Sequence, residues 1–270
     1  MSDHTERHSG MIAIRCLMRF RAHRVTAWAL VLLLIPALAP VNAQALPDNS
    51  IAQILEKMQR HDENQKAALK HYNTVRHYRA EYHGYATTLA ATMDVAVTYD
   101  APFGKSFRVV AQSGSKLLCD KVLKKAVDSE QEASRDPAST ALTPANYRFA
   151  LDGQETVDGR PAYILKVEPL KESKFLYRGR IWIDAADFAL IKFEATPAKN
   201  PSFWIARTLI RFSNQKIGDF WLPQLSRSET KVRIGGTAML VIDYGAYQLL
   251  PSIPGPSRPT PENNREGRLN

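Results

Sequence analysis

The chain has 270 residues, with 36 Lys and Arg against 27 Asp and Glu, and a formal charge of +9. Without residues 1–43, which hold five Arg and two acids, that charge falls to +6. Basic and acidic residues alternate through the remainder, and the only basic run that stands out is Lys124-Lys125, which argues against a nucleic-acid-binding protein. The roughly 200 residues between the two ends suit one domain.

The N-terminal segment has the pattern of a secretory signal peptide. An apolar run, residues 27–39, follows a region with four arginines, and Val41 and Ala43 fit the −3 and −1 positions of a cleavage site. We predict cleavage after Ala43, with Ala45 as the second choice. The alternative is an uncleaved anchor, but the run is shorter than the roughly 20 residues that a spanning helix needs. The polar residues before the run leave two later start codons open, Met11 and Met18.

A helix is predicted over about residues 50–72. Ser50 and Gln53 have the spacing of a capping box, which marks a helix start. Apolar residues then recur at helical spacing and form one stripe: Ile51, Ile54, Leu55 and Met58. We expect this stripe to dock on the rest of the domain.

Alternation of apolar and polar residues with a period of two follows this helix and predicts strands. It is interrupted by a second helical pattern over residues 116–135, which ends at Asp136-Pro137. The predicted turns are residues 101–104, 158–161 and 185–187. The alternation then continues to Tyr247.

These patterns predict about nine or ten antiparallel strands and two helices. So many strands in one layer must curl, so we predict an α+β, mostly β fold: a curled antiparallel sheet forming a half-open barrel with helices as lid or plug. This domain covers residues 44–250. Residues 251–270 hold few apolar side chains and are expected to form a disordered tail. Cys119 is the only cysteine of the mature chain, so we expect it to be a small buried residue without a disulfide.

No catalytic pattern stands out in the sequence. It lacks a Gly-rich phosphate loop, a dinucleotide fingerprint and a nucleophile elbow. His71, His77 and His83 recur every six residues, which gathers three rings neither on one helix nor on one strand. Asp184 and Asp187 fit turn positions better than a pair of catalytic acids. We predict no catalytic residue, no metal and no cofactor, with an uncharacterised enzyme as the alternative.

Large apolar side chains are common in the later strands and suit either a solid core or the wall of an apolar cavity. The residues predicted to line such a cavity are Trp182, Phe193, Trp204, Ile210, Phe212, Trp221, Leu240 and Ile242. Small residues at Ala80, Gly84, Ala206 and Ala238 leave room for a cavity.

Several segments together resemble a known superfamily. They are DGRPAYILKV at residues 158–167, GRIWID at residues 179–184, WLP at residues 221–223 and the closing strand, residues 238–247. This succession is similar to the periplasmic lipoprotein carriers of the LolA and LolB superfamily, which includes outer-membrane lipoprotein-sorting proteins. The resemblance covers roughly residues 50–249.

The resemblance implies a half-open barrel whose helices close over an apolar cavity. It also implies a periplasmic protein that binds the acyl chains of lipids or lipoproteins without covalent chemistry, together with an inner- or outer-membrane partner protein. The helices from Ser50 and Lys116 are the expected lid, and Arg79 is the candidate residue that ties it shut. The alternative within the same fold is an envelope sensor or interaction module without transport.

Overall fold

The computed structural model describes residues 49–200, 202–233 and 235–250. The predicted signal peptide and C-terminal tail lie outside these residues. The helical segments are α1 (Ile51–Ala68), α2 (Lys116–Leu118), the π-helical turn η1 (Cys119–Leu123), α3 (Lys124–Arg135) and α4 (Pro137–Thr140). The strands are β1 (His71–His83), β2 (Thr88–Asp100), β3 (Gly104–Gly114), β4 (Tyr147–Val157), β5 (Arg160–Pro169), β6 (Tyr177–Asp184), β7 (Leu190–Pro197), β8 (Ile205–Ile217), β9 (Phe220–Val232), β10 (Thr237–Asp243) and β11 (Tyr247–Leu250).

Helix α1 begins where the sequence predicts. The Ser50 hydroxyl accepts from the backbone N–H of Gln53, and the Gln53 side chain accepts from the backbone N–H of Ser50, so the capping box is complete. The helix ends at Ala68, four residues before the predicted end. The prediction was wrong there because His71 and Tyr72 pair with β2 and β11, and strand pairing overrides the helical spacing.

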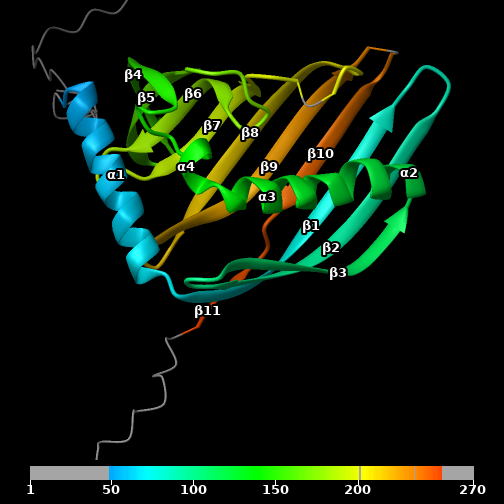
Figure 1. The fold of residues 1–270 in the computed structure, drawn as a ribbon, viewed down its shortest axis with the longest axis horizontal. Coiled ribbons are helices and arrows are strands. Elements are labelled where there is room, and N and C mark those ends of the chain that lie inside the picture. The colour runs from blue at the N-terminus through cyan, green and yellow to red at the C-terminus, as the bar shows by residue number, and fades with distance from the viewer. Residues whose placement is uncertain (1–48, 201, 234, 251–270) are drawn as a thin grey trace, which may run out of the picture. The chain divides into compact units, whose positions relative to one another are not determined.

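The described strands form one antiparallel sheet (Figure 1). The order is β3-β2-β1-β10-β9-β8-β7-β6-β5-β4, and β11 pairs with β1 beyond the end of β10. This confirms the predicted α+β, mostly β class. Among the described elements none is long and apolar enough for a helical membrane span.

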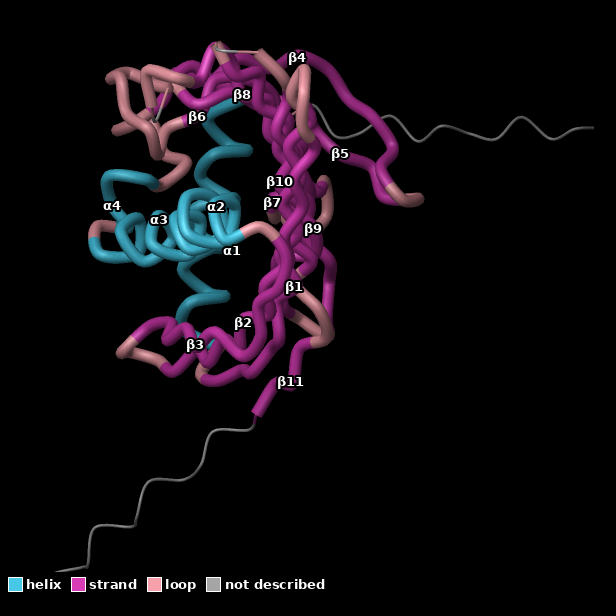
Figure 2. The backbone as a smooth tube through the Cα atoms, turned by 90° about the vertical axis from the view of Figure 1, so that its right-hand side faces the viewer, coloured by secondary structure: helices cyan, strands magenta, loops and turns pink. Residues whose placement is uncertain are grey.

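The sheet is open, because β3 and β4 end it on either side without pairing with each other. It is neither closed nor strongly curled, so the half-open barrel of the sequence prediction is not formed. The reason is that the helices already cover parts of one face, and burial of that face does not require closure. Figure 2 shows the helices together on one side of the strands.

Two separate hydrophobic cores lie between the helices and the sheet. One lies under α1 and contains Ile54 and Met58 with residues of β4, β5 and β6. The other lies under α2, η1 and α3 and contains Leu118, Leu123 and Val127 with residues of β1 and β2. Full burial of one such side chain contributes roughly 1.5–3 kcal/mol. Helix α1 and the segment formed by α2, η1 and α3 are therefore each anchored to their own half of the sheet.

The predicted structural roles of two groups of residues hold in the described chain. Cys119 is buried and free. Asp184 accepts from the backbone N–H groups of Ala186 and Asp187, and Arg160 donates two hydrogen bonds to its carboxylate. Asp184 thus shapes the β6–β7 turn and is paired with a cation.

Candidate functional site

A strip of incompletely buried side chains runs across the middle of the helix-facing side of the sheet. It crosses β7, β8, β9 and β10 and borders both cores, because Phe193 packs against the core under α1, and Leu240 and Ile242 pack against the core under α2, η1 and α3. We call it the central strip; it consists of Phe193, Ile210, Phe212, Ser226, Ser228, Leu240 and Ile242. The strand register places these residues on one face, because Phe193 pairs with Phe212, Ile210 with Ser228, and Leu240 with Ser228. Five of the seven side chains are apolar, and all seven are half-buried.

Aromatic rings form a ladder along this strip. Tyr177 stacks on Phe193 with ring centroids 5.7 Å apart, and Phe193 stacks on Phe212 at 5.1 Å. Phe212 meets Tyr244 edge-on at 6.1 Å. Burial raises the pKa of both tyrosines in the ladder, so both hydroxyls stay neutral at physiological pH. The ladder is a continuous apolar surface from β6 to the end of β10.

Arg76 lies at the end of the ladder and is completely buried. Its guanidinium carbon lies 4.6 Å from the ring centre of Tyr244 and 5.5 Å from that of Phe107, which are cation–π contacts. Its Nη1 donates to Oε2 of Glu130 on α3 at 2.5 Å. Lys105 donates to the other carboxylate oxygen of Glu130 at 2.9 Å. One carboxylate therefore joins α3 to both β1 and β3.

The electrostatics of this cluster favour its charged form. Burial opposes the charge on Arg76, but Glu130 outweighs it and raises the pKa of Arg76. Burial also opposes the charge on Glu130, while Lys105 and Arg76 outweigh it and hold the pKa of Glu130 below its ordinary value. Nε and Nη2 of Arg76 have no hydrogen-bond partner within the described part of the chain. The guanidinium is thus held mainly by Glu130 and by the two rings.

The second half of α3, residues 128–135, covers the sheet without packing into it. None of its side chains is buried, and Ala133 is its only apolar residue. Hydrogen-bonded ion pairs hold it to other elements: Glu130 pairs with Arg76 and Lys105, and Glu132 pairs with Lys174 at 2.8 Å. In Figure 1, α3 passes in front of β9 and β10, the strands that carry much of the central strip.

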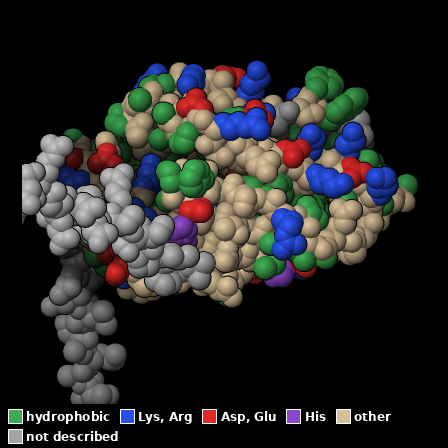
Figure 3. All heavy atoms as spheres, turned by 60° about the horizontal axis from the view of Figure 1, so that its bottom comes forward, with side chains coloured by type: hydrophobic (Ala, Val, Ile, Leu, Met, Phe, Trp, Pro, Cys, Tyr) green, Lys and Arg blue, Asp and Glu red, His purple; other side chains and the backbone are tan. Residues whose placement is uncertain are grey.

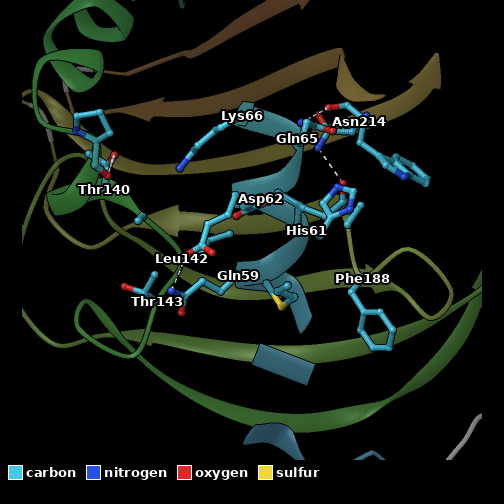
Figure 4. A pocket seen from close by; sticks show the side chains of 17 residues that line it. Gln59, His61, Asp62, Gln65, Lys66, Thr140, Leu142, Thr143, Phe188 and Asn214 are labelled. Carbon is cyan, nitrogen blue, oxygen red and sulfur yellow. Dashed lines mark hydrogen bonds between the residues drawn. The ribbon is translucent and has the colours of Figure 1, made fainter. Parts of the chain in front are cut away.

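A pocket of about 450 Å³ opens between α1, the segment around α4 and the β7–β8 region. We call it the α1 pocket. Figure 4 shows Gln59, Asp62 and Lys66 extending from α1 toward Thr140 and Thr143. Its floor includes Leu190 and Asn214. Leu190 precedes the central-strip residue Phe193 on β7, and Asn214 comes after Phe212 on β8, on the helix-facing side of the sheet. The pocket therefore adjoins the strip.

The α1 pocket has polar groups that remain unsatisfied or perturbed. Nε2 of His61 is buried and lacks a hydrogen-bond partner among the described residues. Asp62 is exposed as a residue, but its carboxylate turns into the pocket (Figure 4). Burial raises its pKa, and the attraction of His61 and Lys66 offsets this only in part. The pocket thus presents polar side chains next to an apolar floor.

The structure distributes the predicted cavity residues over three places. Phe193, Ile210, Phe212, Leu240 and Ile242 belong to the central strip. The two tryptophans at positions 182 and 221 are buried together in another cluster, where Trp182 donates to Glu155 and Trp221 donates to Asp187. Trp204 precedes β8 and is 57% exposed. These three tryptophans lie outside the strip, although Trp221 also borders the α1 pocket.

Arg79, which the sequence analysis chose as the residue that ties the lid shut, lies on the face of β1 that points away from the helices. Arg79 is exposed and alternates with buried Tyr78 and Ala80, whereas Arg76 shares the face of these two residues. The sheet-to-helix ion pair on β1 is therefore made by Arg76. The sequence contained a signal for this, because Arg76 has the same parity as the buried apolar positions of the strand. The α1 pocket was also missed, since its lining comes from segments far apart in the chain.

The three spaced histidines lie apart, as their spacing predicts. His71 pairs with Asp100 at 3.0 Å, and His77 pairs with Asp94 at 2.8 Å. His83 lies 3.5 Å from Glu81. Within residues 49–250, as far as they are described, no three metal-ligating side chains converge on one point.

No known protein family and no curated protein matches this sequence. Solved structures do match it. A DUF1329 family protein from Desulfovibrio piger is 14% identical, covers 76% of this chain and 95% of its own, and has a TM-score of 0.37. A LolA superfamily protein from Nitrosomonas europaea is 12% identical, with 76% and 96% covered and a TM-score of 0.35. A Vibrio parahaemolyticus domain assigned to the outer membrane lipoprotein-sorting proteins is 11% identical, with 74% and 94% covered and a TM-score of 0.35.

Proposed function

We propose that this protein is a non-enzymatic carrier that binds an acyl chain of a lipid or lipoprotein on the central strip, beneath the second half of α3. The observation that carries the proposal is the mismatch between these two surfaces. Apolar side chains are left half-buried on the sheet, while the helix segment above them offers almost no apolar side chain to cover them. Such a surface is stabilised by an apolar ligand.

The chemistry of the strip suits a hydrocarbon tail. Its apolar side chains and the aromatic ladder provide contact area without directed polar groups. Each buried methylene contributes on the order of 0.8 kcal/mol, so a tail of ordinary length is bound without any covalent step. The polar α1 pocket adjoins the strip and is a suitable place for the polar end of such a ligand.

Opening requires that the second half of α3 moves away from the sheet. This segment buries no side chain of its own, so its displacement pulls no side chain of the helix out of a core. The contacts that must break are the Glu130 pairs with Arg76 and Lys105, and the Glu132 pair with Lys174. Leu123 and Val127 keep the first half anchored in its core, so the helix can act as a hinged lid.

In this proposal the working protein is the mature domain, residues 44–250, in the periplasm. The apolar run and the small residues before Ala43 support export with cleavage at that point.

Displacement of a fluorescent fatty acid from the purified protein tests the proposal. Ile210→Asn places a polar amide on the central strip and should weaken binding by about tenfold or more, because the apolar contact is lost. Leu209→Asn is the matched control, since Leu209 is also half-buried but lies on the other face of the same strand. Its affinity should stay near that of the wild type.

Two results would refute the carrier. One is the absence of binding at micromolar concentrations by wild-type protein whose circular dichroism shows a folded β-rich chain. The other is an equal loss of affinity in both asparagine variants with unchanged melting temperatures, because binding would then not depend on the helix-facing side.

A further inference from the structure

Three large aromatic side chains are exposed near one end of the sheet. Tyr85 in the β1–β2 turn is 95% exposed, and Phe203 and Trp204, just before β8, are 76% and 57% exposed. The rings of Phe203 and Trp204 pack edge to face with centroids 5.5 Å apart. Exposed aromatic groups of this kind mark interaction sites for proteins or membranes.

The β9–β10 turn joins these rings. The backbone N–H of Arg233 donates to the carbonyl oxygen of Trp204 at 2.8 Å, and its guanidinium lies 5.3 Å from the ring centre of Phe203. On the other side of the turn, Gly235 has a φ of +106° and packs so closely on the Tyr85 ring that a Cβ would collide with it. We call Tyr85, Phe203, Trp204 and Arg233 the aromatic tip.

Two further cations lie next to the aromatic tip, on β8 and β9. Arg207 on β8 and Lys231 on β9 are register partners, and both are exposed, as is Arg233. The next acid along β9 is Glu229, which lies 3.5 Å from Arg211. In Figure 3, hydrophobic side chains lie next to basic and acidic ones toward the right-hand end of the view.

We propose that the aromatic tip docks on an anionic lipid bilayer, with its rings in the interfacial layer and Arg207, Lys231 and Arg233 on the phosphates. Trp and Tyr prefer this layer because one part of each ring system is apolar and another is polar. Basic residues next to an anionic surface each add about 1 kcal/mol of attraction. The exposed rings match the interfacial layer and the cations match the anionic surface, and this combination favours a lipid bilayer over a protein partner. The inference is independent of the carrier proposal.

Vesicle flotation tests the inference with protein expressed from its full-length gene. Wild-type protein should float with phosphatidylglycerol-containing vesicles, bind less to pure phosphatidylcholine, and detach as salt rises toward about 0.5 M. The combined variant Tyr85→Ser, Phe203→Ser and Trp204→Ser should lower partitioning by about tenfold or more, since the interfacial anchors are gone. Phe103→Ser is the matched control, because Phe103 is 88% exposed in the β2–β3 turn, at the other end of these strands.

Tryptophan quenching gives a second measurement. Lipids brominated on the acyl chain should quench emission of the wild type, and Trp204→Phe should remove most of that quenching. The inference is overturned if the wild type does not bind anionic vesicles, if the triple variant binds as the wild type does, or if Phe103→Ser loses as much binding as the triple variant. In the first case a protein partner would be the remaining occupant of the tip.

Discussion

The two helical segments that lie on the sheet are held in different ways. Helix α1 buries Ile54 and Met58 in its core, and its C-terminal part is fixed to β9 by hydrogen bonds. Its Gln65 side chain accepts from the backbone N–H of Trp221 and donates to the carbonyl oxygen of the same residue. The second half of α3 has no buried side chain and is held by ion pairs centred on Glu130.

This difference separates a structural helix from a movable one. To move α1, its buried side chains must leave their core and the hydrogen bonds of Gln65 must break. Ion pairs can be replaced by water at one end of a helix while the other end stays in its core. Both helices were expected to form the lid, but this comparison assigns that role within our proposal to α3 alone.

Removal of the Glu130 carboxylate should have the largest effect. Glu130→Ala leaves Arg76 buried without its anionic partner, and loss of one partner of a buried ion pair costs about 3–5 kcal/mol. Denaturant unfolding followed by circular dichroism measures this loss. The matched control is Glu132→Ala, which breaks the half-exposed pair with Lys174 and should cost less than about 1 kcal/mol. Equal losses of unfolding free energy in the two variants would contradict the expected difference between a buried and an exposed ion pair.

Truncation of the α1 anchor should come next. Ile54→Ala removes a completely buried side chain, and such truncations cost about 2–5 kcal/mol, of which we expect about 3. The neighbouring Leu55→Ala serves as control, because Leu55 is only half-buried and should cost less. Hydrogen exchange should show increased opening of α1 in Ile54→Ala while protection of α3 is unchanged. Coupled loss of protection in both helices would mean that the two cores do not act separately.

The sequence anticipated the features that depend on neighbouring residues. Ser50 and Gln53 determine the start of α1 locally, and the helical spacing through residues 116–135 ends before Pro137 as predicted. These signals are local, so one sequence is sufficient to find them.

Features that depend on distant pairing were missed. The face on which Arg76 lies was visible in the alternation, but its partner Glu130 lies 54 residues away. The degree of curl depends on how much of the sheet the helices cover, and the α1 pocket needs residues from α1 and β8 to meet. The spacing of neighbouring side chains determines neither the curl of the sheet nor the α1 pocket.

Acid should loosen α3 before α1. The pKa of Glu130 lies below its ordinary value of 4.5, so its ion pairs stabilise the fold fully above that value and are lost as pH falls through the lowered pKa. Unfolding free energies measured between about pH 6 and pH 3 should therefore fall more steeply for the wild type than for Glu130→Ala. Ile54→Ala should keep the wild-type slope, since its contact carries no charge. Parallel slopes for the wild type and Glu130→Ala would show that Glu130 does not sense pH.

The smallest effect is expected at the N-terminus of α1. Ser50→Ala removes the hydroxyl that accepts from the N–H of Gln53, and loss of such a cap costs about 1 kcal/mol. Gln53→Ala removes the reciprocal hydrogen bond and should cost no more than this. Both changes should shift thermal unfolding by a few degrees and leave ligand exchange on the central strip unaltered, because α1 does not move in the proposed opening. A change in ligand exchange rates in Ser50→Ala, measured by stopped-flow fluorescence, would show that α1 takes part in the lid after all.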